Sequence, residues 1–200
     1  MSDTKIFTQA DIDQLQEGKH YDHCVFNELS LTGKHLQETT FSNCSFEHAN
    51  LRSVKFNASV FTNCNFSNAL VEGCNFFSTV FNECKLVGIT LSKVESLVGV
   101  TFNQCIFDYS DMRGLDLSGM NLEKSSFNET DLSLANLEKT SFINSRFTMV
   151  NLNGTKCLAT DLRGATLQGV SLKDGDLAGV IITPLQLQML ASEIGIQVLE

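Results

Sequence analysis

The sequence is poor in basic residues, in proline and in long apolar runs. Its 14 Lys and Arg residues stand against 23 Asp and Glu, which gives a formal net charge of −9. This balance argues against direct nucleic-acid binding, because contacts to phosphates need clustered positive charge. No run approaches the ~20 apolar residues of a membrane-spanning helix. Residues 1–20 are acidic where a secretory signal would be basic and then apolar, so we expect a cytoplasmic protein without membrane contact.

The sequence also lacks the common signatures of catalytic and cofactor sites. It contains no phosphate-binding loop, no zinc-finger spacing and no recognisable set of nucleophile, base and acid. His20, His23 and Cys24 are the one cluster with metal-binding side chains, but they lack a fourth ligand and are more typical of ordinary polar positions. We therefore expect neither enzymatic activity nor a cofactor.

The 7 cysteines are expected to be reduced residues of the core. They form no Cys-x-x-Cys pair, and their odd number does not suggest a disulfide framework. Six of them stand two residues before a recurring Phe or Leu, where Ala, Ser and Thr otherwise occur: Cys24, Cys44, Cys64, Cys74, Cys84 and Cys105. Cysteine therefore replaces other small residues at a buried position.

The feature that is present is a period of five residues. A large apolar residue, here called the central residue, recurs at every fifth position over 26–91 and again, one residue out of phase, over 97–182. Every phenylalanine except Phe7 and Phe77 is a central residue. A period of five fits neither a helix nor a strand, so the chain must turn at every repeat. Repetition at a fixed period indicates a solenoid.

The clearest repeats combine a small residue, Asn or Asp, the central residue and two polar residues, as in 49–53 and 135–139. This pattern resembles the pentapeptide-repeat family over roughly 22–183. The resemblance implies an all-β solenoid, a right-handed quadrilateral β-helix in which four repeats make one coil. The central residue and the residue two before it, the minus-two position, then point inward. Residues 20 apart should stack, as in the columns Cys24, Cys44, Cys64, Cys84 and Phe107, Phe127, Phe147.

Non-repetitive segments flank the repeats, as the open ends of a solenoid require. We divide the chain into an N-terminal cap (1–21), a first repeat segment (22–91), a phase slip (92–96), a second repeat segment (97–182) and a C-terminal helix and strand (183–200). The expected apolar contacts of the cap are Ile6, Phe7, Ile12 and Leu15.

The C-terminal segment starts with a helix signal, Thr183 followed by the single proline, Pro184. Gly195 is the expected end of the helix, and 196–199 alternates like a short strand. This tail is small for the cap of a monomer, so we expect it to join two chains about a twofold axis. The predicted dimerisation residues are Leu185, Met189, Leu190, Ile194, Ile196 and Val198.

The phase slip adds one residue between Leu91 and Leu97. In the shifted register Glu95 falls at a minus-two position, where an unpaired carboxylate should not be buried. We therefore expect a break or bend of the solenoid at 92–96. The alternative is a bulge that leaves the axis straight.

Negative charge is concentrated in 95–138, where eight acidic residues face two basic ones, whereas 139–182 has five basic and three acidic residues. At 20 residues and about 4.8 Å per coil the acidic stretch spans about 11 Å. This gives one net negative charge per about 1.8 Å, close to the value of ~1.7 Å for duplex DNA. The alternative is that these charges only keep the surface soluble. The predicted partner-binding residues are Glu95, Asp108, Asp111, Asp116, Glu123, Glu129, Asp131 and Glu138.

Within the family, the acidic repeats, the mid-chain slip and the tail are most similar to the topoisomerase-protecting branch, with its Qnr quinolone-resistance proteins and its immunity proteins against albicidin and microcin. The resemblance implies a homodimeric, non-catalytic DNA mimic that binds DNA gyrase or topoisomerase IV and protects it from poisons. Qnr proteins carry projecting loops, whereas the slip inserts one residue here, which favours a loop-less immunity protein. The alternative is a structural scaffold with a different protein partner.

Overall fold

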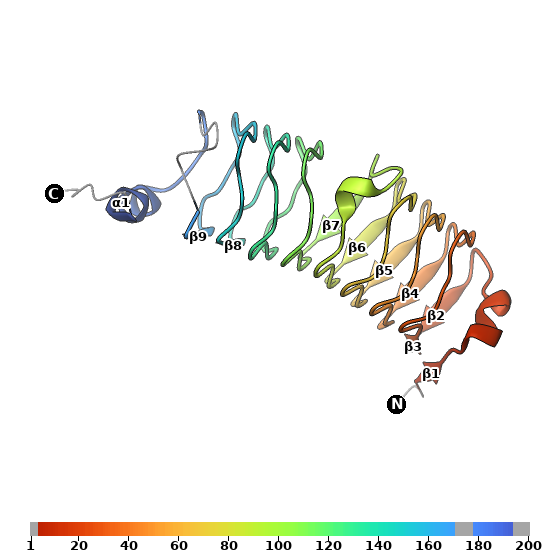
Figure 1. Ribbon diagram of the computed structural model, residues 1–200. Coiled ribbons are helices and arrows are strands. Elements are labelled where there is room, and N and C mark those ends of the chain that lie inside the picture. Colours follow the sequence, from red (N-terminus) through yellow and green to blue (C-terminus); the bar gives the residue numbers. More distant parts are fainter. Residues whose placement is uncertain (1–3, 171–177, 194–200) are drawn as a thin grey trace.

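The computed structural model describes residues 4–170 and 178–193, and the chain forms a β-solenoid whose coils follow a curved path (Figure 1). Parallel bridges join residues 20 apart on each of four sides, for example Val25 to Ser45 and Ser30 to Asn50. The predicted right-handed quadrilateral β-helix is confirmed. We number the sides in chain order by their first central residues, which are Tyr21 for side 1, Phe26 for side 2, Leu31 for side 3 and Leu36 for side 4.

The longer strands gather on sides 1 and 2. Side 1 carries a five-stranded parallel sheet of β2 (His20–Asp22), β4 (Thr40–Ser42), β5 (Val60–Thr62), β6 (Val80–Asn82) and β7 (Thr101–Asn103), in that order. Side 2 carries two parallel pairs, β1 (Lys5–Ile6) with β3 (Cys24–Val25) and β8 (Arg146–Thr148) with β9 (Thr166–Gln168). Isolated bridges connect the coils elsewhere.

In every described repeat except that of Leu91 and the last one, the chain turns at the residue two after the central one, which has a positive φ. At His48, for example, φ is 56°, and the amide of Ala49 closes the turn by donating to the carbonyl of Phe46 at 3.0 Å. Glycine at this place also allows close stacking. A Cβ added to Gly88 would lie 2.5 Å from Oδ1 of Asn68 in the preceding coil. The turn chemistry therefore explains why the chain can change direction every five residues.

The core is a set of stacked columns of central residues. Phe61 lies parallel to Phe41 and Phe81 in the adjacent coils, with ring centroids 5.0 and 5.1 Å apart, and meets Phe56 and Phe66 edge-on. Both geometries are favourable for aromatic rings. The cysteine thiols are all buried, as predicted, and form no disulfide in the described part of the chain. Burial raises the pKa of the Cys74 thiol to about 12, so it stays protonated at neutral pH.

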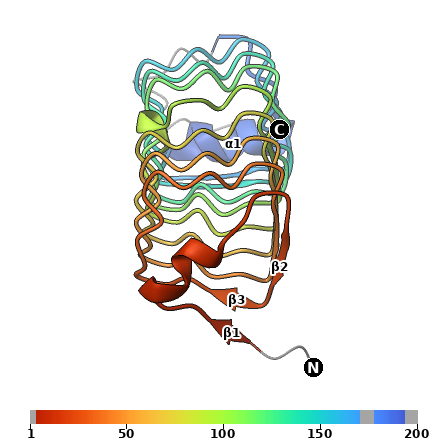
Figure 2. The same cartoon turned by 90° about the vertical axis from the view of Figure 1, so that its right-hand side faces the viewer.

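The N-terminal segment lies across the first coil (Figure 2). Strand β1 extends the ladder of side 2, and η1 (Gln9–Gln14) follows it. Phe7 is buried and its ring centroid is 4.6 Å from that of Phe26, while Ile12 and Leu15 are also buried. Ile6 differs from the expectation because it is 72% exposed. In β1 its side chain alternates with that of Phe7, so only one of the two can face the core.

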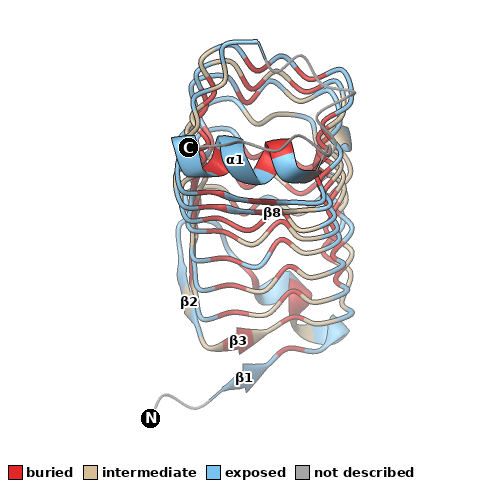
Figure 3. Cartoon of the chain, turned by 90° about the vertical axis from the view of Figure 1, so that its left-hand side faces the viewer, coloured by how far each residue is buried: buried red, intermediate tan, exposed pale blue. Residues whose placement is uncertain are grey.

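At the other end, α1 (Pro184–Glu193) lies across the last coils (Figure 3). It begins at Pro184 as predicted. The side chain of Gln186 accepts hydrogen bonds from the amide and hydroxyl of Thr183, and the Thr183 hydroxyl accepts the amide of Gln186. This reciprocal pair is a capping box. Gln186 Nε2 also donates to the carbonyls of Leu162 and Ala165 at 2.6 and 2.8 Å, which ties the helix to the solenoid.

At the phase slip, the backbone changes from bonding with the following coil to bonding with the preceding one. Thr90 is bridged forward to Asp111, and the chain then turns through η2 (Leu91–Lys93). After η2, Ser96 is bridged back to Asn75, and β7 pairs with β6 in a register of 21 residues. The chain therefore steps back towards the N-terminal coils at the slip. A bend of the axis at 92–96 remains a prediction.

The extra residue does not place Glu95 at the minus-two position, so the register predicted for this residue is wrong, while its exposed side chain agrees with the expectation that the carboxylate is not buried. Val94 takes the minus-two place instead, with its amide donating to the carbonyl of Leu91 at 3.2 Å. The Glu95 amide donates to the carbonyl of Cys74, as an outward residue does in other coils. Its carboxylate points outward and contacts Nζ of Lys55. Burying valine rather than a carboxylate avoids the desolvation of a charge.

The step at the slip leaves a break in the ladder on sides 4 and 1. In this fully described region, no hydrogen bond joins 94–104 to 115–124. The next pair of coils is bonded on the same sides, for example from the amide of Leu117 to the carbonyl of Asn136 at 2.9 Å. Sides 2 and 3 stay bonded across the break, through Phe107 to Ser126 and Met112 to Asp131. The gap between 94–104 and 115–124 is called the inter-coil cleft below.

Candidate functional site

The predicted acidic residues lie on all four sides of the solenoid and are exposed or half-buried. Each side contributes at least one of them: Glu123 on side 1, Asp108 and Glu129 on side 2, Asp111 and Asp131 on side 3, and Glu95, Asp116 and Glu138 on side 4. The repeat forces this spread, because outward positions follow one another around the coil. The structure therefore brings the eight residues into an acidic belt around the solenoid rather than onto one face.

On side 3 two carboxylates stack with an arginine between them. Asp111 and Asp131 are bridged in adjacent coils. Arg113 donates to Asp111 from Nε at 2.9 Å and from Nη2 at 2.6 Å, and its Nε lies 3.8 Å from Asp131. The hydrogen bonds from Arg113 lower the pKa of Asp111. Arg113 thus offsets part of the charge of this side, a contact that charge counting along the sequence does not show.

Three other carboxylates are oriented by neutral donors. Asp108 accepts hydrogen bonds from the Ser126 hydroxyl at 2.6 Å and from the amide and side chain of Asn128 at 3.0 Å. Asp116 accepts the amide of Ser118 and the side chain of Asn136, both at 3.1 Å, and the bonds from Ser118 are the main cause of its lowered pKa. Glu123 Oε1 accepts from the Ser141 hydroxyl at 2.8 Å. These hydrogen bonds hold the three carboxylates in fixed positions.

Two acids of the belt have no cation or donor of their own. Among the described residues, the carboxylates of Glu129 and Glu138 form no hydrogen bond or ion pair. Glu129 is exposed at a turn of side 2, and Glu138 is half-buried on side 4. They are therefore the belt residues most able to pair with cations of a partner.

The coils beyond the belt carry basic side chains. Lys139, Arg146 and Lys156 are exposed, whereas Arg163 is held by Asp161 through three hydrogen bonds of 2.6 to 3.1 Å. The positive charge of 139–182 is thus only partly available in the described residues.

The tail presents an apolar surface on α1. Leu185, Leu187 and Met189 are 66, 58 and 57% exposed. Leu190, which was expected at a dimer interface, is only 6% exposed because it packs against its own coils. Sequence reasoning missed Leu187, although it stands between Leu185 and Met189, which were both predicted at the interface. The remaining predicted dimerisation residues lie outside the described residues: Ile194, Ile196 and Val198.

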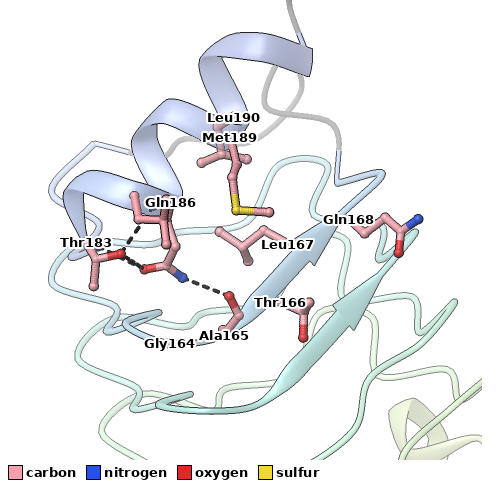
Figure 4. A pocket seen from close by; sticks show the side chains of 10 residues that line it. Gly164, Ala165, Thr166, Leu167, Gln168, Thr183, Gln186, Met189 and Leu190 are labelled. Carbon is pink, nitrogen blue, oxygen red and sulfur yellow. Dashed lines mark hydrogen bonds between the residues drawn. The ribbon is translucent and has the colours of Figure 1, made fainter. Parts of the chain in front are cut away.

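A cavity of about 350 Å³ lies between α1 and the last coils (Figure 4). Leu167, Met189 and Leu190 line it, and Gln186 lies at one end, where its amide bonds to Ala165. The cavity is therefore mainly apolar and adjoins the exposed side chains of α1.

Within residues 4–170 and 178–193, no group of three or more His, Cys, Asp or Glu side chains could hold a metal ion. In the same residues, no helix is long and apolar enough to cross a membrane.

The stacked coils define a four-sided β-solenoid with an apolar core. Its charged side chains lie on the outer surface. The chain belongs to the pentapeptide-repeat family. Residues 18–91 match the pentapeptide repeat region, and residues 116–154 and 146–183 match pentapeptide repeats in eight copies. A comparison with curated protein sequences finds no match.

Solved structures of QnrB1, a plasmid-mediated fluoroquinolone resistance protein, are similar to this chain. Full-length QnrB1 has a TM-score of 0.71 and 16% identity, and the match covers 96% of this chain and 95% of QnrB1. A trypsin-treated variant of QnrB1 has a TM-score of 0.56 and 18% identity, with 98% and 95% covered. At this identity the likeness shows a shared fold. It agrees with the expected likeness to the Qnr branch.

Proposed function

We propose that this protein is a non-catalytic DNA mimic that binds DNA gyrase or topoisomerase IV and protects it from topoisomerase poisons. The observation that carries the proposal is the acidic belt, which surrounds the solenoid at 95–138. Duplex DNA also presents its phosphates around its whole circumference. A basic groove shaped for DNA therefore meets negative charge on any side of this solenoid that faces it.

Binding of this kind needs no bond to be made or broken. Carboxylates that are already oriented by Ser118, Ser126 and Asn128 lose little freedom on binding a lysine or arginine. Glu129 and Glu138 add charges that form no hydrogen bond or ion pair among the described residues. Complementary charge accelerates the encounter and makes the affinity decrease with salt. Protection then follows if the protein and the poisoned DNA compete for one groove.

We propose further that the protein acts as a homodimer joined through its C-terminal segment. The support is the exposed apolar surface of Leu185, Leu187 and Met189 beside the cavity at the end of the solenoid. Exposed apolar groups close together are typical of an interaction surface. A twofold pair would extend the solenoid to about twice its length.

A gyrase assay tests the proposed function. We expect purified protein at micromolar concentration to reduce DNA supercoiling or the cleavage caused by a gyrase poison. The variant Glu129→Gln/Glu138→Gln should be weaker, whereas the matched control Glu28→Gln/Glu47→Gln, in the first coils, should equal the native protein. Unchanged supercoiling and unchanged drug-induced cleavage with the native protein would reject the proposal.

One observation favours a scaffold with a different protein partner. Lys139, Arg146 and Lys156 are exposed close to the proposed dimer surface, where a mimic of DNA should be acidic. A scaffold predicts that gyrase is unaffected at every protein concentration, which the same assay would reveal.

A further inference from the structure

The inter-coil cleft leaves one edge of the side 1 sheet without a partner strand. Strand β7 is the last strand in the order β2-β4-β5-β6-β7 (Figure 1), and within the fully described residues 94–124 the next coil does not bond to it. The amides of Phe102 and Gln104 form no hydrogen bond in this fully described region. An open edge of this kind is the usual template for an added strand.

Side 4 continues the open edge around the corner of the coil. Among the described residues, the amides of Leu97 and Gly99 have no hydrogen-bond acceptor, and the carbonyls of Asp116 and Ser118 on the opposite wall have no donor. In the following pair of coils the equivalent amides, those of Leu117 and Gly119, donate to carbonyls at 2.9 Å. Both walls of the cleft therefore offer backbone groups that one extended chain could satisfy.

The floor of the cleft exposes part of the core. Leu97 is the one central residue from 26 to 167 that is not fully buried. Val94, Leu115 and Met120, at minus-two positions, are also only partly buried. These side chains line a cavity of about 370 Å³ on side 4, and a second cavity of about 200 Å³ continues beside Phe102 on side 1. The site thus has room for an apolar side chain.

The rim of the cleft is acidic. Glu95 and Asp116 line the cavity on side 4, and Glu123 lines the cavity on side 1, where Lys124 is the basic residue. On each of the two sides, a chain that inserts here would hold alternate side chains inward and outward. Charge complementarity then favours an occupant with apolar residues facing the floor and Lys or Arg facing the rim.

We propose that the inter-coil cleft binds a basic segment of a partner protein by strand addition along Leu97–Gln104, with the segment extended on each side and bent at the corner, where Gly99 has a φ of 71°. The segment bonds to the free amides of this wall and to the carbonyls of 116–121. This interaction differs from binding of the acidic belt in a basic groove, because it depends on backbone pairing at one place. It does not require that the partner be a topoisomerase.

Hydrogen exchange tests the proposal on the full chain. In the free protein, the amides of Leu97 and Phe102 should exchange fast, whereas those of Leu117 and Leu122, bonded to the next coil, should be protected. An excess of a short capped peptide of alternating valine and lysine should protect Leu97 and Phe102. The same peptide with N-methyl groups on alternate residues, which cannot donate, should not.

A pair of variants separates the cleft from general acidity. Glu95→Gln/Asp116→Asn should lower the affinity for the valine–lysine peptide by about tenfold, because two charges of the rim are lost. The control Glu28→Gln/Glu47→Gln removes two charges on side 2, in the first coils, and should leave the affinity unchanged. The proposal is overturned if Leu97 and Phe102 are already protected in the free protein, or if the valine–lysine peptide does not protect them. Equal protection by a valine–glutamate peptide would overturn it too.

Discussion

The carboxylate of Glu95 contacts the ammonium group of Lys55, two coils earlier on the same side of the solenoid. This contact exists because the extra residue of the slip turns Glu95 outward while Val94 takes its place in the core. The bond from Lys55 is the main cause of the lowered pKa of Glu95. The slip therefore adds an ion pair on side 4, beside the inter-coil cleft.

The pH dependence of this pair has a definite sign. Because the pKa of Glu95 is lower in the folded chain than the ordinary value of 4.5, the pair stabilises the fold above that value. The stabilisation is lost as the pH falls through the folded pKa. We expect Glu95→Gln to lower the urea midpoint slightly at pH 7 and not at about pH 3. In Glu129→Gln, which removes an unpaired acid, the midpoint should match that of the native protein at both pH values.

The core columns predict a large effect of Phe127→Ala. Phe127 is fully buried, with its ring centroid 5.1 Å from that of Phe107 and 5.2 Å from that of Phe147. Its loss should lower the free energy of unfolding by about 3–5 kcal/mol in urea titrations. Phe77→Ala is the matched control, because Phe77 is 47% exposed, and its cost should be below about 1 kcal/mol. Equal losses of unfolding free energy in Phe127→Ala and Phe77→Ala would contradict the inward position of Phe127.

Gln186 should matter more than its neighbour Gln188. Gln186→Ala removes the capping box and leaves the carbonyls of Leu162 and Ala165 without their donor. We expect a loss of about 2 kcal/mol in the free energy of unfolding. Gln188 is exposed on the same helix, so Gln188→Ala should have almost no effect. The comparison fails if both variants unfold at the same urea concentration.

The proposed dimer depends on the exposed residues of α1. Leu187→Asp/Met189→Asp should give a monomeric mass in light scattering, because two charges replace side chains that are more than half exposed. Gln188→Asp, which adds one charge between them, should keep the dimeric mass. If the double variant stays dimeric while its secondary structure is unchanged, the interface lies elsewhere.

The five-residue period was enough to predict a solenoid, and the resemblance to the pentapeptide-repeat family supplied its four sides. A central residue such as Phe61 is buried because the period returns it to the same side of every coil, which requires no knowledge of distant contacts. The cysteines at the minus-two position followed from the same pattern. The start of α1 was also predictable, since Thr183 and Pro184 carry a local signal.

The slip marks where this reasoning ends. Counting residues placed Glu95 at a minus-two position, but the chain instead packs Val94, partly buried, against the core, which costs no desolvated charge. The inter-coil cleft could not be predicted, because the sequence does not show whether the coil with the extra residue bonds to the coil before it or to the coil after it. Leu190 shows a similar limit, since helical spacing identifies an apolar face without saying whether a second chain or the same chain covers it.

The central claim is that the solenoid and DNA compete for one groove of a type II topoisomerase. Displacement of fluorescently labelled linear duplex DNA from purified gyrase, followed by anisotropy at low and moderate salt, tests it most directly. The account predicts that the native protein displaces the DNA completely. The belt variant Glu129→Gln/Glu138→Gln should do so only at a higher protein concentration. DNA that stays bound while the protein also binds gyrase, or that stays bound at every protein concentration, would contradict the account.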